Sequence, residues 1–191
     1  MYRINEIFYS LQGEGFHTGT PAVFVRFSGC NLHCPFCDTD FGQYTLHSAK
    51  EICQQVADLI QEKEGLPASS TLVVLTGGEP SLQVDEELIN ELHQTVKTIC
   101  IETNGTHSLP HGIDWITCSP KEGSKVVLKQ ANEVKVVYTG QNVEPWQRQI
   151  SAQHYFLQPC SCRNTQETIE YILGHPTWRL SLQAHKLTGV R

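Results

Sequence analysis

Short apolar segments recur along this chain of 191 residues, and six of them end in a cluster of glycine and polar residues. A run such as 72–75 (Leu-Val-Val-Leu) is typical of a strand covered on both faces, and segments with helical apolar spacing lie between several of these runs. This alternation predicts an α/β fold with a mainly parallel sheet or barrel. Only about ten residues follow Ile101 before the next strand, too few for a crossover helix. We therefore predict a shortened, incomplete α/β barrel that forms a single domain over residues 1–191.

The expected elements follow from these patterns. Strands are predicted at 23–27, 72–75, 99–101, 115–117, 134–137, 155–157 and 178–180. Helices are predicted at 48–60, around 88–96 and at 164–173. Ser48 with Glu51, and Asn164 with Glu167, have the spacing of capping boxes, so Ser48 and Asn164 are expected to cap two of these helices.

The clusters at the strand ends predict one site. In parallel α/β folds the carboxyl ends of the strands lie on the same rim, and binding sites are built there. Turn chemistry explains any one cluster, but six clusters on one rim indicate a site. The clusters are Gly29-Cys30, Thr76 to Pro80, Glu102 to Gly105, Ser119 to Lys121, Gln158-Pro159 and Gln183 to Lys186.

Charge and hydropathy exclude several classes of protein. The chain has 14 Lys and Arg and 20 Asp and Glu, a net charge of −6, so we expect no direct binding to nucleic acid. No apolar run approaches the roughly 18 residues of a membrane span, so we expect no membrane contact. The polar N-terminus lacks the apolar core of a signal peptide, which predicts a cytoplasmic protein with reduced thiols.

Three of the eight cysteines, Cys30, Cys34 and Cys37, form a C-x3-C-x2-C run. Zinc usually takes four ligands from two separated pairs, and no second pair of that spacing exists, although His33 could complete a zinc site. Three cysteines on a four-iron cluster leave one iron open, which suits substrate binding. The other five are interpreted as packing residues, with Cys160 and Cys162 the least settled.

This run, with Phe36 before the last cysteine, resembles the signature of the radical S-adenosylmethionine (SAM) superfamily, and Thr76 to Pro80 resembles its Gly-Gly-Glu motif. Further segments resemble the 7-carboxy-7-deazaguanine synthases over residues 5–186. These segments are Leu11 to Gly15, Arg26 to Leu32, Cys37 to Thr39, Ile101 to Gly105, Ser119 to Lys121 and Leu182 to Lys186.

The resemblance implies three cofactors. A 4Fe-4S cluster on Cys30, Cys34 and Cys37 would bind SAM at its open iron and cleave it to a 5′-deoxyadenosyl radical. Mg²⁺ on Thr39 would orient the substrate carboxylate. Gly78, without a Cβ, would let the main chain approach SAM. The expected SAM-binding residues are Phe36, Cys37, Asp38, Gly78, Glu102, Asn104, Ser119, Pro120, Lys121 and Gln158.

The implied substrate is 6-carboxy-5,6,7,8-tetrahydropterin, which this family converts to 7-carboxy-7-deazaguanine in queuosine biosynthesis. The reaction is a radical ring contraction with loss of ammonia, so the enzyme is a carbon–nitrogen lyase. The expected substrate-binding residues are Gln12, Gly13, Glu14, Arg26, Thr76 and His185. No acid–base residue is assigned.

Side chains alternate between the two faces of a strand, so Arg26 lies on one face of the predicted strand and its neighbours Val23 and Val25 lie on the other. If that face lines the barrel, an unpaired guanidinium is costly and a substrate carboxylate is its natural partner. The alternative is an arginine that reaches solvent at the strand end. Gln12 and Glu14, between glycines, can pair with pterin N–H groups or form a plain turn.

Two other functions stay open at this point. An activase that installs a glycyl radical in a partner protein would share the cysteines and the Gly-Gly-Glu motif, and a zinc-binding interaction module would share the cysteines alone. For the synthase we expect an electron donor of the flavodoxin or ferredoxin type and a homodimer.

Overall fold

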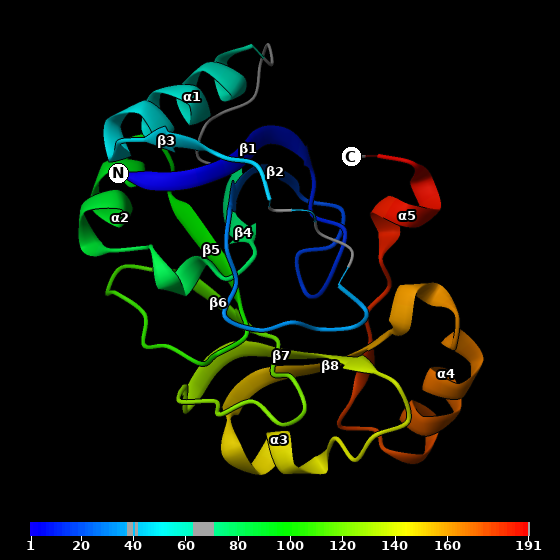
Figure 1. Cartoon of the computed structure of the whole chain (residues 1–191). Coiled ribbons are helices and arrows are strands. Elements are labelled where there is room, and N and C mark those ends of the chain that lie inside the picture. The colour runs from blue at the N-terminus through cyan, green and yellow to red at the C-terminus, as the bar shows by residue number, and fades with distance from the viewer. Residues whose placement is uncertain (38–39, 41, 63–70, 191) are drawn as a thin grey trace.

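One curved, mixed sheet organises the molecule (Figure 1). The computed structural model describes residues 1–37, 40, 42–62 and 71–190. In that part of the chain nine strands pair in the order β3-β1-β2-β4-β5-β6-β7-β8-β9. The strands are β1 (Tyr2–Leu11), β2 (Pro21–Phe27), β3 (Thr45–His47), β4 (Leu72–Gly77), β5 (Thr98–Thr103), β6 (Trp115–Cys118), β7 (Gln130–Tyr138), β8 (Ser151–Pro159) and β9 (Arg179–Leu180).

The sheet is parallel from β2 through β9, and its two edge strands, β3 and β9, are not paired with each other. This confirms the predicted incomplete barrel. The sequence did not reveal β1, which runs antiparallel to β2 and β3 and carries the chain back to the start of the parallel strands. Because the other strands share one direction, their carboxyl ends meet at one rim, as the strand-end clusters predicted.

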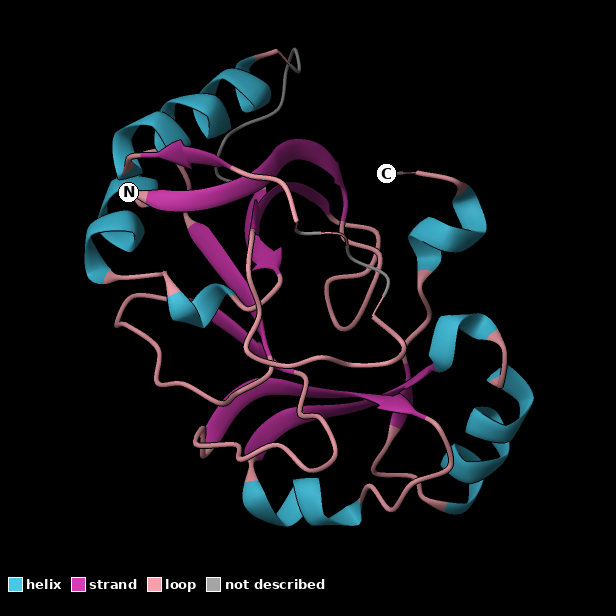
Figure 2. Cartoon of the chain, in the orientation of Figure 1, coloured by secondary structure: helices cyan, strands magenta, loops and turns pink. Residues whose placement is uncertain are grey.

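The described part of the chain forms five helices, of which α1 to α4 lie on the outside of the curved sheet and α5 lies at its open edge (Figure 2). They are α1 (Ala49–Gln61), α2 (Glu86–Leu92), α3 (Glu144–Gln149), α4 (Thr165–Gly174) and α5 (Ala184–Thr188), with short 3-10 turns at Pro80–Leu82 and Cys160–Cys162. The described chain has no helix between β5 and β6, as the short spacing predicted. None of the described helices is both long and apolar enough to cross a bilayer.

The core of the described residues has two large clusters, and a smaller third cluster holds Ala22, Leu72, Val74 and Cys100. One large cluster buries the apolar face of α1 and α2 against β1, β2, β4 and β5, and it contains the predicted stripe from Leu88 to Val96. The other large cluster joins β7 and β8 to α3 and α4 around Trp178, which is 2% exposed. Cys100 and Cys118 are buried, which confirms their interpretation as packing residues.

One of the two predicted helix caps is present. The Ser48 hydroxyl accepts a hydrogen bond from the Glu51 amide, and the Glu51 side chain accepts one from the Ser48 amide, which is a complete capping box. Asn164 stands at the N-cap position of α4, as predicted, but it forms no capping box, because its side chain makes no cap contact. It accepts from the Cys160 amide at 2.8 Å and donates to the Tyr138 carbonyl at 2.9 Å, so it joins β7 to the turn after β8.

The gap between the sheet edges is filled by segments from the two ends of the chain. The loop between β1 and β2 meets the segment that follows β9: the Ala184 amide donates to the Gly13 carbonyl at 2.9 Å, and the Gly15 amide donates to the Ser181 hydroxyl at 2.9 Å. An added Cβ on Gly13 would overlap the ring of His185, so this close approach requires glycine.

We expect Ser48→Ala to lower the free energy of unfolding by about 1 kcal/mol, because the substitution leaves the Glu51 amide in the first turn of α1 without its side-chain acceptor. Equilibrium urea denaturation measures the change. Lys50→Ala, an exposed substitution in the same turn, is the matched control and should change stability by less than about 0.5 kcal/mol. Equal losses for the two variants would contradict the capping role.

Candidate active site at the open end of the barrel

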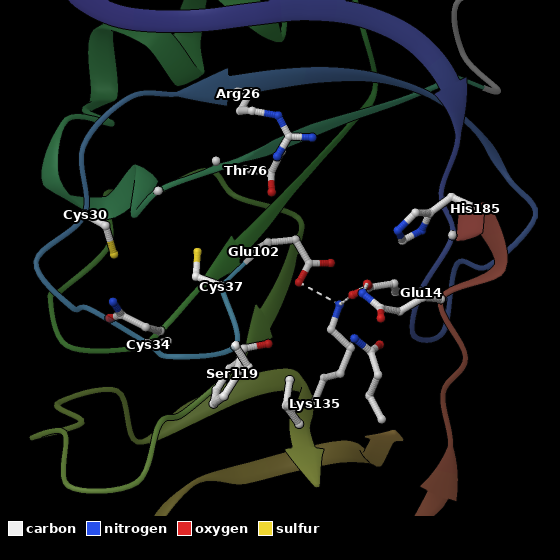
Figure 3. A pocket seen from close by; sticks show the side chains of 18 of the residues that line it. Glu14, Arg26, Cys30, Cys34, Cys37, Thr76, Glu102, Ser119, Lys135 and His185 are labelled. Atoms are coloured by element: carbon white, nitrogen blue, oxygen red, sulfur yellow. Dashed lines mark hydrogen bonds and ion pairs between the residues drawn. The ribbon is translucent and has the colours of Figure 1, made fainter. Parts of the chain in front are cut away.

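A cavity of about 600 Å³ lies inside the curved sheet (Figure 3). Its walls include sixteen of the residues that the sequence assigned to the site. These are Gln12, Gly13, Glu14, Arg26, Cys30, Cys34, Phe36, Cys37, Thr76, Gly78, Glu102, Asn104, Ser119, Lys121, Gln158 and His185. Pro120 is buried but does not line the cavity, and Asp38 and Thr39 lie outside the described residues.

The three cysteines stand together on one side of this cavity (Figure 3). No disulfide engages them, nor any other of the eight cysteines, all of which lie in the described part of the chain. Burial raises the pKa of the Cys30 thiol, and the amide of Leu32 donates to its Sγ at 3.4 Å. Three thiols on one cavity wall are the donor set of an iron–sulfur cluster with one open iron, so these residues fit such a group.

The Gly-Gly-Glu segment supports the cysteine loop through backbone contacts. The Gly78 amide donates to the Phe27 carbonyl at 3.0 Å, and the Glu79 amide donates to the Gly29 carbonyl at 2.9 Å. An added Cβ on Gly78 would overlap the Gly29 carbonyl oxygen. The resemblance implies that Gly78 lacks a Cβ so that the main chain can approach SAM. The contact with Gly29 in the cysteine loop already requires glycine at this position.

Glu79 has an internal role. Its carboxylate is 1% exposed and accepts hydrogen bonds from the Thr103 hydroxyl and the Asn104 amide, both at 2.6 Å, and from the Ser81 amide at 3.0 Å. Since two of these donors belong to the end of β5, Glu79 joins the rim of β4 to the rim of β5.

A second connection runs from the cysteine loop to β5 through side chains. The Asn104 amide group donates to Asn31 Oδ1 at 3.0 Å, and Asn31 donates to the Thr106 hydroxyl at 2.8 Å. The segment after β6 closes this side of the cavity, where Lys121 Nζ donates to the Ser119 carbonyl at 2.6 Å. Burial lowers the pKa of Lys121.

Arg26 lies in the cavity wall, as its strand periodicity predicted, but it already has a partner. Its Nε donates to Glu6 Oε1 at 2.8 Å, and its guanidinium lies over the Phe8 ring at 5.7 Å from the centroid. The antiparallel register of β1 places Glu6 beside Arg26, so a protein carboxylate partners the guanidinium, which the sequence did not predict.

Lys135, which no sequence motif had indicated, lies across the cavity from the three cysteines (Figure 3). Its side chain is 5% exposed, and Nζ lies 2.7 Å from Glu14 Oε2 and 2.9 Å from Glu102 Oε2. Burial favours the neutral form of Glu14, but the Lys135 ammonium lowers the pKa of that carboxyl to about 2. Burial raises the pKa of Glu102 to about 7, against the opposing effect of Lys135.

A sequence signal for this group was present in β7. Glu133 and Lys135 alternate with Val134 and Val136, so the two charged side chains share a face of a strand whose other face is apolar. Glu133 is 1% exposed, and it accepts from the Phe16 amide at 2.8 Å and from the Thr117 hydroxyl at 3.0 Å. It therefore holds the loop after β1 against the start of the parallel strands.

Comparison with known proteins identifies the family. The sequence model described as the Radical SAM superfamily matches residues 24–139. The 7-carboxy-7-deazaguanine synthase of Bacteroides thetaiotaomicron is 56% identical, with full coverage of both chains. This chain belongs to the 7-carboxy-7-deazaguanine synthase family of radical SAM enzymes. The synthase of Bradyrhizobium diazoefficiens is 43% identical over 100% of this chain and 99% of its own.

The fold of the family is also the fold of this chain. The crystal structure of QueE from Escherichia coli matches with a TM-score of 0.78 at 30% sequence identity, and the match covers 96% of this chain and 94% of that chain. Membership of the family confirms that the chain is an enzyme with a 4Fe-4S cluster and SAM as cofactors and a small molecule as substrate. It sets aside the zinc-binding module and the glycyl-radical activase.

We expect Gly78→Ala to destabilise the protein by about 1–3 kcal/mol and to lower its iron content after anaerobic reconstitution, because the new Cβ displaces the Gly29 backbone and with it Cys30. Chemical denaturation and iron analysis measure the two effects. Gly174→Ala is the matched control, since nothing lies within 4 Å of a Cβ there. Full iron loading of Gly78→Ala would show that the cysteine loop does not depend on this contact.

Proposed function

We propose that this enzyme converts 6-carboxy-5,6,7,8-tetrahydropterin to 7-carboxy-7-deazaguanine, by radical ring contraction with loss of ammonia, as a step toward queuosine. The observation that carries the proposal is that one cavity joins the three cysteines on one side to Gln12, Glu14, Arg26 and His185 on the other. The relatives named 7-carboxy-7-deazaguanine synthase support it. The whole chain acts as a single radical SAM domain.

The cysteine side of the cavity holds the cofactors in this proposal. Cys30, Cys34 and Cys37 bind the cluster, and when bound the cluster and SAM supply the one-electron cleavage that starts the reaction. The protein orients SAM and excludes water around it. The resemblance assigns SAM contacts to Phe36, Cys37, Asp38, Gly78, Glu102, Asn104, Ser119, Pro120, Lys121 and Gln158, and of the described residues in this set Pro120 alone does not line the cavity.

The opposite side recognises the substrate. Arg26 binds the substrate carboxylate, and its ion pair with Glu6 aims the guanidinium into the cavity. Lys135 keeps Glu14 ionised, and the Glu14 carboxylate accepts hydrogen bonds from N–H groups at the edge of the pterin. The Gln12 side-chain amide forms hydrogen bonds to the same edge. Gly13, Thr76 and His185 complete the substrate wall. Mg²⁺ on Thr39 neutralises the substrate carboxylate together with Arg26.

Three further features belong to the proposal. The exposed Cys37 side of the cavity is where a flavodoxin- or ferredoxin-type donor delivers its electron. Exposed Leu173 on α4 and Leu187 on α5 offer apolar surface to a second copy in a homodimer. The cysteines without disulfides fit a reducing, cytoplasmic environment.

The decisive assay is anaerobic reconstitution with iron and sulfide, followed by reductant, SAM, Mg²⁺ and 6-carboxytetrahydropterin. We expect 7-carboxy-7-deazaguanine by mass spectrometry, with ammonia released in equal amount. Cys34→Ala, which removes a cluster thiol, should bind less iron and give no product. Absence of product from wild-type protein with a fully loaded cluster would overturn the proposal.

We expect Arg26→Ala to retain iron and SAM binding while raising the substrate Kd by at least about tenfold, because a charge-assisted hydrogen bond to the substrate carboxylate is lost. Anaerobic equilibrium binding measures the substrate Kd. Arg179→Ala, which removes an exposed arginine on β9, serves as the control. If Arg26→Ala loses its iron instead, the residue supports the fold and not the substrate.

A further inference from the structure

We propose that Lys135 is a positioning residue that holds Glu14 and Glu102 in place and thereby joins the substrate side of the cavity to the SAM side. The inference rests on the proposed function, because that function assigns the two carboxylates to different molecules. The family resemblance assigned no role to Lys135, so the role proposed here is argued from its contacts.

The contacts make Lys135 a bridge. Its Nζ reaches Glu14, on the loop after β1, and Glu102, on β5, at 2.7 and 2.9 Å (Figure 3). The strands β2 and β4 separate β1 from β5 in the sheet, and the Lys135 side chain from β7 connects the two elements across the barrel interior. Gln183 Nε2 donates to Glu14 Oε1 at 3.0 Å, which holds the second oxygen of this carboxylate.

Burial makes the bridge costly to break. Lys135 is 5% exposed and its two partners are each 19% exposed, so an unpaired charge in this group would lose most of its hydration. Two carboxylates contact the ammonium, and a third, that of Glu133 on the same face of β7, adds to the electrostatic attraction. Burial favours neutral Lys135, but these carboxylates raise its pKa above the ordinary range.

Other charged groups facing the cavity do not replace Lys135 in this arrangement. Arg26 pairs with Glu6, and Lys121 donates to the Ser119 carbonyl. His185 lies near Glu14 and lowers the pKa of that carboxyl less than Lys135 does. The charged and titratable side chains around the group are Glu133, Lys121, His185, Lys186, Arg26, Glu6 and Cys100.

The chemical consequence concerns hydrogen-bond polarity. An ionised carboxylate only accepts hydrogen bonds, which matches the N–H groups at the edge of a pterin, whereas a protonated carboxyl also donates. Without the Lys135 ammonium, the pKa of Glu14 rises, since burial then acts unopposed by its main partner. Substrate recognition would become dependent on pH in a range where the wild-type carboxylate is fully ionised.

The test is the pH dependence of substrate binding by reconstituted Lys135→Met, measured anaerobically as the Kd of 6-carboxytetrahydropterin in the presence of SAM between pH 6 and 9. We expect the Kd to rise at least about tenfold at pH 6 and to recover as the pH increases and Glu14 ionises. Lys135→Arg keeps the cation and should follow the wild-type profile. Lys129→Met, an exposed lysine next to β7, is the matched control.

The outcomes separate the two proposals. Failure of the wild-type enzyme to bind the pterin would overturn the proposed function, whereas a Lys135→Met profile parallel to that of wild type would overturn the role of Lys135 alone. A uniform loss of iron, SAM and substrate at every pH would mean that Lys135 only supports the fold. If Lys135→Met does not fold, Lys135→Gln replaces it, because glutamine removes the charge but keeps a hydrogen-bond donor, and the same pH-dependent Kd is expected of it.

Discussion

The unclosed edge of the sheet is the constraint on which the rest of this structure depends. A parallel barrel that stops at β9 leaves backbone groups and an opening that other segments must cover. Here the loop after β1 and the segment after β9 cover it, held by the contacts of Gly13 with Ala184 and of Gly15 with Ser181. The same contacts bring Glu14 and His185 into the cavity, so the segments that cover the open edge also form part of the cavity wall.

The two sides of the cavity are held by different forces. On the cysteine side, backbone meets backbone without room for a Cβ at Gly78, and the buried Glu79 carboxylate joins neighbouring strand ends. On the opposite side, Lys135 holds two carboxylates through short ionic contacts. Steric contact gives a fixed frame for a cluster, whereas an ionic group sets the charge that a polar substrate meets.

Particular residues show how far sequence reasoning reached. The cysteine run, the Gly-Gly-Glu segment and the polar strand ends were placed on one cavity because parallel strands end on a common rim. The roles of these residues stay predictions. Asn164 was predicted to form a capping box with Glu167. That spacing carries no information about Tyr138 and Cys160, which the Asn164 side chain joins in space. The pairing of Arg26 with Glu6 was not predicted, because β1, which supplies Glu6, was not recognised as a strand.

The sequence by itself determined the parallel strands β2 and β4 to β9, the helices α1, α2 and α4, the Ser48 cap and most residues of the cavity, because these follow from local periodicity and spacing along the chain. It did not reveal β1, β3, α3 or α5. Only the tertiary structure decided which charges meet. Glu14, Glu102 and Lys135 are separated by 88 and 33 positions along the sequence (102 − 14 and 135 − 102), and no local pattern relates them. Curvature of the sheet brings them within contact distance, and their burial then makes an unpaired charge among them costly.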